Sequence, residues 1–115
     1  MEELFKIAET EMTEMKHPYV GTEHFLLAFL KVYGNKYLNY QMLKDYIMKV
    51  IGSSHKSSEY ILYTPVLRKI KNECNNINEC MIRILTDDDS IAYNLLLSMK
   101  VDVEAFYLSI INNIY

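Results

Sequence analysis

Cysteine is scarce in this sequence, and tryptophan is absent. The two cysteines, Cys74 and Cys80, match neither a CxxC pair nor the paired spacing of a zinc knuckle, which argues against a redox or zinc site. Because there is no N-terminal apolar segment with a cleavage site, we expect no secretory signal peptide. We therefore predict a cytoplasmic protein in which both thiols are reduced.

Positive charge is sparse as well. The formal net charge is −3, and the lysines and arginines are scattered, whereas phosphate binding needs a basic patch. The apolar run Phe25–Leu30 is far shorter than the ~20 residues that cross a bilayer. We expect neither nucleic acid nor a membrane as a partner.

Motifs for catalysis and metal binding are missing too. No G-x-x-x-x-G-K-[ST] loop occurs, so ATP hydrolysis by that machinery is excluded. Asp87–Asp89 lacks the glycine and the remaining ligands of an EF-hand. His17 and His24 have no neighbouring ligand of known spacing, which favours a structural role for both. We predict a protein that is not an enzyme and that binds no metal or cofactor.

Hydrophobic residues, by contrast, make up 50% of the sequence, which is enough for a core. A length of 115 residues fits a single domain, 1–115. Apolar residues recur at helical spacing, and no stretch alternates with period two between hairpin turns. The predicted fold class is all-α, a compact helical bundle.

The chain is organised around Val20–Leu30, in which a small polar start leads into six apolar residues. We expect the Thr22 hydroxyl to cap this helix and Glu23 to place negative charge at the positive end of the helix dipole. A helix that is apolar all round is normally buried all round. The sequence thus predicts a central helix that runs to about Val32, and capping is the simplest role for Thr22 and Glu23.

Amphipathic helices are predicted on both sides of it in the first half. The first spans about Met1 to Lys16, where Pro18 ends it. Its apolar stripe is Leu4, Phe5, Ala8, Met12 and Met15, and its glutamates, mostly on the other face, are Glu2, Glu3, Glu9, Glu11 and Glu14. A continuous helix follows Gly34-Asn35, with the stripe Leu38, Met42, Leu43, Tyr46, Ile47, Val50 and Ile51.

The second half carries its own helix starts. Thr64 followed by Pro65 is a specific start signal, because threonine caps well and proline fits the first helical position. Asn75-Asn76 interrupts that helix and a shorter one follows. We expect Asp87–Ser90 and Asp102 to cap the last two helices.

The two halves also resemble each other. Asn78-Glu79 precedes an apolar helix in the second half, as Thr22-Glu23 does in the first. We interpret this echo as an internal repeat. Repeat one spans about 1–52, a polar linker covers 53–58, and a degenerate repeat two spans about 59–115.

Three segments are similar to the Clp N-terminal domain, the twice-repeated helical module of Clp-type AAA+ unfoldases, and most similar to its ClpC branch. They are His17–Leu27 (H-P-Y-V-G-T-E-H-F-L-L), the restart Tyr63–Pro65, and the late segment from Ser90 to Val103. The resemblance covers almost the whole chain. It implies a pseudo-twofold bundle, usually of eight helices, that receives protein substrates and adaptor proteins for an attached ATPase ring.

The resemblance also implies a ligand site. The family's equivalent glutamate helps to bind a cationic or arginine-phosphorylated tag, assisted by a threonine near a helix start of the other repeat. Carried over residue by residue, this points to Glu23, Thr64 and Glu79. The chemistry is suitable, because a guanidinium pairs with a carboxylate and a phosphate binds the unpaired amides of a helix N-terminus.

The chain departs from the family pattern in several places. Compared with the family, the sequence lacks a segment before the first helix, part of the region before Gly52, and most residues between Pro65 and Glu79. Ile77–Cys80 replaces Gly-Thr-Glu-His, and the 115 residues end where the family's ATPase would begin. Two functions stay open. One is a non-catalytic module that binds substrates or adaptors in cis for a Clp unfoldase; the other is a free-standing regulatory subunit that docks on Clp machinery or competes for its adaptors.

Overall fold

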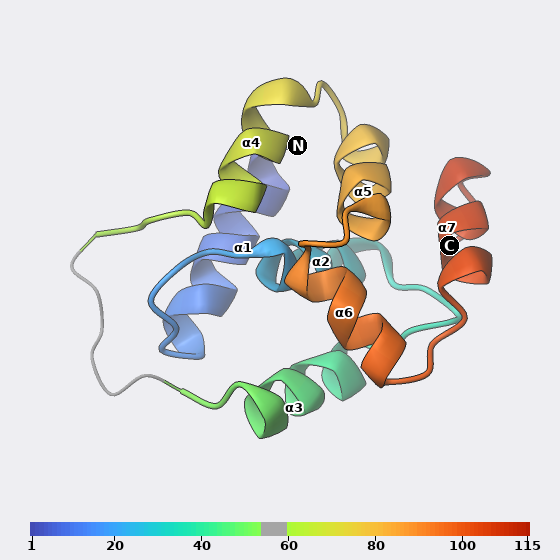
Figure 1. Cartoon of the computed structure of the whole chain (residues 1–115). Helices are drawn as coiled ribbons and strands as arrows, with labels where there is room; N and C mark the ends of the chain where they lie inside the picture. Colours follow the sequence, from blue (N-terminus) through green and yellow to red (C-terminus); the bar gives the residue numbers. More distant parts are fainter. Residues whose placement is uncertain (54–59) are drawn as a thin grey trace.

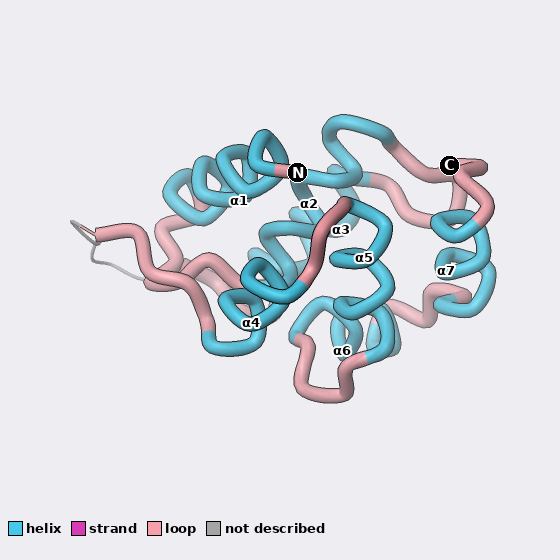
Figure 2. The backbone as a smooth tube through the Cα atoms, turned by 90° about the horizontal axis from the view of Figure 1, so that it is seen from above, coloured by secondary structure: helices cyan, strands magenta, loops and turns pink. Residues whose placement is uncertain are grey.

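Seven helices follow one another in residues 1–53 and 60–115, the part of the chain that the computed structural model describes (Figures 1 and 2). They are α1 (Glu2–Glu14), α2 (Thr22–Tyr33), α3 (Tyr40–Val50), α4 (Pro65–Glu73), α5 (Ile77–Thr86), α6 (Ile91–Ser98) and α7 (Val103–Ile111). The all-α prediction is confirmed. In the described residues extended pairing is limited to one parallel bridge, between Val20 and Tyr63, and none of the helices combines the length and the apolar character needed to span a membrane.

Helix α2 lies in the middle of the bundle, where Figure 1 shows it behind α6. It packs against α1, α3 and α6, while α5 packs against α4, α6 and α7. Every side chain from Phe25 to Leu30 is at most 3% exposed. The predicted central helix is therefore confirmed, and the bundle closes around it with a radius of gyration of 13.1 Å.

The predicted helix starts of the second half are also confirmed. The side chains of Thr64, Ser90 and Asp102 accept hydrogen bonds from the amides of the residues three positions later. These bonds satisfy amide groups that have no partner within their own helix. Within the predicted Asp87–Ser90 cap it is Ser90 that occupies the capping position.

The expected cap of α2 is wrong. Gly21, not Thr22, precedes the first helical residue. The Thr22 hydroxyl oxygen instead accepts a hydrogen bond from the amide of Ala92 at 3.0 Å and lies 3.1 Å from the Ser90 hydroxyl. Thr22 therefore joins α2 to the start of α6, because its side chain is buried between them.

Two predicted faces also need correction. Glu11, expected among the outward glutamates of α1, is fully buried and paired with Tyr40, Lys31 and Lys44. In α3 only a narrow face is buried, and three residues of the predicted stripe are exposed: Met42, Val50 and Ile51. Most of the predicted linker, 53–58, lies outside the described residues.

Candidate functional site

The starts of α2 and α4 lie side by side because the chain before each helix forms the parallel bridge. The amide of Val20 donates to the carbonyl oxygen of Leu62 at 2.8 Å, and the amide of Thr64 donates to the carbonyl oxygen of Val20 at 2.9 Å. Gly21, the N-cap residue of α2, directly follows Val20, and Thr64, the N-cap residue of α4, donates the second of these bonds. Segments from the two halves of the chain are thereby fixed together.

The start of α6 joins them through the bonds of Thr22 to Ala92 and Ser90. Three helix N-termini consequently meet at one place, and each carries a partial positive charge. A pocket of about 270 Å³ opens there. It is lined by His17, Pro18, Tyr19, Glu23, His24, Ile51, Thr64 and Ile91.

Glu23 is the only carboxylate among the described residues that line this pocket. Only 4% of Glu23 is exposed, and its Oε1 atom has no hydrogen-bond partner in the described part of the chain. Burial raises the pKa of Glu23 to about 7, against a smaller opposing effect of its own backbone amide. An acid that titrates near neutrality in a pocket is typical of a functional site.

His17 and His24 form a hydrogen-bonded chain beside Glu23. The amide of Gly21 donates to Nδ1 of His24 at 2.9 Å, Nε2 of His24 lies 2.8 Å from Nδ1 of His17, and Nε2 of His17 lies 2.6 Å from the carbonyl oxygen of Gly52. Since Gly21 can only donate and the Gly52 oxygen can only accept, two neutral rings must both carry their proton on Nε2. The chain ties the start of α2 to the end of α3.

Neither ring offers Glu23 a donor. Nδ1 of His24 is 3.6 Å from Glu23 Oε1, but it already accepts the Gly21 amide. Burial, together with the charge of His17, lowers the pKa of His24 to about 3, so the ring stays neutral near pH 7. The predicted structural role of the two histidines agrees with this geometry, but no sequence pattern indicated that they bond each other.

Gly21 makes room for the Glu23 carboxyl group. A Cβ atom at position 21 would lie 1.8 Å from Glu23 Oε1 and 2.9 Å from its Cδ atom. The carboxyl group thus folds back over the glycine at the start of its own helix. The spacing Gly21-x-Glu23 was visible in the sequence, but its steric meaning required the structure.

The three predicted site residues do not form one group. Glu23 and Thr64 line the same pocket. Glu79 is exposed and accepts a hydrogen bond from the amide of Asn75 at 2.7 Å, just before α5, whose N-cap residue is Asn76. It lines a different, open depression beside Asn78 and Tyr115.

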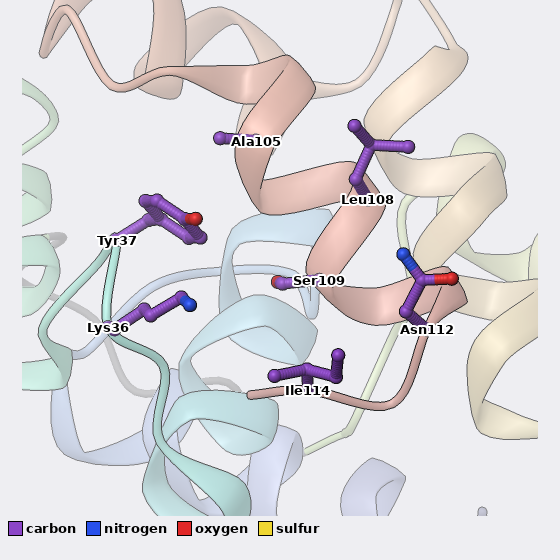
Figure 3. Close-up of a pocket in the computed structure, with 7 residues that line it drawn as sticks. All are labelled: Lys36, Tyr37, Ala105, Leu108, Ser109, Asn112 and Ile114. Atoms are coloured by element: carbon purple, nitrogen blue, oxygen red, sulfur yellow. The ribbon is translucent and has the colours of Figure 1, made fainter.

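A further pocket, of about 220 Å³, lies between α7 and the segment after α2 (Figure 3). The hydroxyl group of Ser109 in this pocket is already engaged: it accepts from the side chain of Asn35 at 3.0 Å and donates to the carbonyl oxygen of Phe106. Ser109 is therefore used by the fold itself. The Glu23 pocket, with its unpartnered buried oxygen, remains the stronger candidate.

No family model matches this chain, and neither does any curated protein in a search of their sequences.

Proposed function

We propose that the chain is a non-catalytic protein-binding module of the Clp N-terminal type, and that its Glu23 pocket receives a cationic side chain of a protein substrate or adaptor. The observation that supports this best is the Glu23 carboxyl group, buried at the confluence of three helix starts with one oxygen unpartnered. A buried carboxylate without an internal partner gains strongly from an external one.

The pocket walls suit a side chain with a long apolar stem. Pro18, Ile51 and Ile91 contribute hydrocarbon surface, and the half-exposed ring of Tyr19 stands at the rim. Arginine and lysine place a charge at the end of such a stem. Arginine fits better, because its planar guanidinium pairs with a carboxylate through two hydrogen bonds and also stacks on aromatic rings.

An arginine-phosphorylated protein is the alternative ligand that the pocket suits, because its side chain keeps the guanidinium and adds a negatively charged phosphate group. Thr64, the N-cap residue of α4, lines the same pocket as Glu23, and its hydroxyl oxygen accepts a hydrogen bond from the amide of Leu67. A phosphate group is favoured at helix N-termini by their amides and dipoles. In this arrangement Glu23 takes the guanidinium and the Thr64 side takes the phosphate.

The proposed architecture consists of two pseudo-symmetric repeats, α1–α3 and α4–α7. The sequence similarity between Thr22-Glu23 and Asn78-Glu79 supports it, with Thr22 the first residue of α2 and Asn78 the second residue of α5. Repeat one then has three helices and repeat two has four. The total of seven described helices is one fewer than the family's usual eight. The module works in the cytoplasm for a Clp ATPase or protease, either in cis or as a separate subunit that docks on it or competes for its adaptors.

The test is calorimetric titration of an arginine-phosphorylated protein into wild type and Glu23→Gln. Gln keeps the shape of Glu but cannot form the ion pair, so we expect binding to weaken by about 1.5–3 kcal/mol, roughly 10- to 150-fold. Glu79→Gln is the matched control, since it changes an exposed glutamate in the first turn of α5.

Two results would count against the proposal. An absence of wild-type binding at millimolar ligand would reject this pocket as a tag site and leave adaptor docking through another face. An equal loss in Glu79→Gln would show that binding is not centred on the Glu23 pocket.

A further inference from the structure

Among the described residues, the Glu23 pocket contains no cationic side chain that could balance a negative charge. The titratable side chains that face Glu23 are His17, His24 and Tyr19, all from α2 or the connection before it. The walls supplied by α3, α4 and α6 are Ile51, Thr64 and Ile91, which do not titrate. No lysine or arginine is among the described residues that line the pocket.

The histidines cannot take over this task. The nitrogen closest to Oε1, Nδ1 of His24, presents a lone pair that is already directed to the Gly21 amide. The protons of both rings point away, along the chain that ends at Gly52. If Glu23 were ionised, its negatively charged Oε1 atom would face the lone pair of His24 Nδ1 at a buried position, which is unfavourable.

We infer that Glu23 carries a proton in the empty pocket in mildly acidic solution and that a cationic ligand displaces this proton, so that binding releases it to the solvent. This inference rests on the proposed function. The exchange balances in charge: the neutral carboxyl group and a cation become an ion pair and a hydronium ion. The pKa of about 7 places the transition in the physiological range.

Proton exchange makes the affinity depend on pH. With a pKa near 7, the cation competes with a bound proton at pH 6 and with almost none at pH 8. We expect binding to be about tenfold weaker at pH 6 than at pH 8, since one proton is exchanged for each ligand. The guanidinium itself keeps its charge throughout this range.

The experiment follows the Glu23 carboxyl carbon by NMR as the pH changes, with the resonance assigned through its correlation to the Glu23 backbone. The probes are N-acetylarginine amide and its N-phosphoryl derivative. We expect a midpoint near 7 without ligand and a fall by more than one pH unit at saturation with the probe that binds. The Glu79 carboxyl carbon, far from the pocket, should not respond to the probe.

The outcomes separate the two proposals. A midpoint near 4.5 in the free protein would overturn the inference whatever binds. Binding seen at other pocket resonances, with an unchanged Glu23 midpoint, would overturn it and leave the proposed function standing. If neither probe perturbs any pocket resonance at pH 6 or pH 8, the proposed function fails and the inference fails with it.

Discussion

Glu11 and Glu23 are two buried glutamates on neighbouring, packed helices, and their surroundings are opposite. Glu11 is fully buried, accepts a hydrogen bond from the Tyr40 hydroxyl at 2.5 Å, and lies 3.0 Å from Nζ of Lys44. Glu23 is 4% exposed and has neither a cation nor a donor for its Oε1 atom among the described residues. The Oε2 atom of Glu11 also lacks a hydrogen bond in the described residues, but it has the Lys44 ammonium group as an ion-pair partner, and Glu23 has no such cation there.

Their ionisation differs accordingly. Burial acts to raise the pKa of Glu11, but the hydrogen bonds from Tyr40 and Lys44 and the charges of Lys44 and Lys31 outweigh it, so its pKa is lowered. For Glu23 burial dominates, and its pKa rises to about 7. Burial alone therefore does not determine the pKa of a buried glutamate. The hydrogen-bond donors and cations beside the carboxyl group decide whether its pKa is lowered, as for Glu11, or raised, as for Glu23.

The comparison predicts the largest effect at Glu11. Glu11→Gln should destabilise the fold by about 2–4 kcal/mol at pH 7, because it removes the charge that Lys44 and Lys31 pair with; both lysines reach solvent, which limits the loss. Urea unfolding measures it. Glu14→Gln, at an exposed partner of Lys44, is the control and should change stability by less than about 0.5 kcal/mol. If Glu11→Gln and Glu14→Gln lowered the free energy of unfolding equally, the buried ion pairs of Glu11 would contribute no more than an exposed one.

Glu23→Gln should act in the opposite direction, and only at high pH. Unfolded Glu23 loses its proton near pH 4.5, whereas the folded form keeps it to about pH 7, so the folded state becomes less stable as the pH rises through this window. Above pH 7 the penalty is complete. We expect the variant to be more stable than wild type by roughly 1–3 kcal/mol at pH 8 and nearly equal at pH 4.

Thermal or urea unfolding at the two pH values measures this difference. A variant that is less stable than wild type at pH 8 would mean that the ionised carboxylate has an internal partner, and the contrast with Glu11 would disappear.

Gly21→Ala should have the smallest effect on stability and still affect the site. The backbone at Gly21 (φ −113°, ψ 179°) suits alanine, but the new Cβ atom would expel the Glu23 carboxyl group from its place. We expect a stability change within about 1 kcal/mol and binding of the arginine ligand roughly tenfold weaker, as for a lost charge-assisted bond. In a Glu23→Gln background the same substitution should change binding little, which a double-mutant cycle tests.

The sequence allowed the helices and the core to be predicted because their signals are local. Thr64 with Pro65, Ser90 and Asp102 satisfy amides in the next turn, and the run Phe25–Leu30 has no polar face to expose. Such rules need only residues a few positions apart.

The errors have a common physical origin in contacts between distant residues. Thr22 was expected to cap its own helix, but it bonds Ala92, 70 residues away. Glu11 is predicted on the outer face of α1, but its partners Tyr40 and Lys44 from α3 and Lys31 from α2 stabilise it in a buried position. The pocket likewise combines Glu23 with Thr64 from the other half, and periodicity along a helix carries no information on such pairs.

The bridge between Val20 and Tyr63 has a thermodynamic consequence for any ligand of the pocket. Because Glu23 and Thr64 come from opposite sides of that bridge, a ligand that contacts both can bind only while the two halves of the chain are joined. Its binding free energy is then added to the free energy that keeps them joined, by RT ln(1 + [L]/Kd). A bound ligand therefore holds the two halves of the chain together, and the folded module is most stable with its ligand bound.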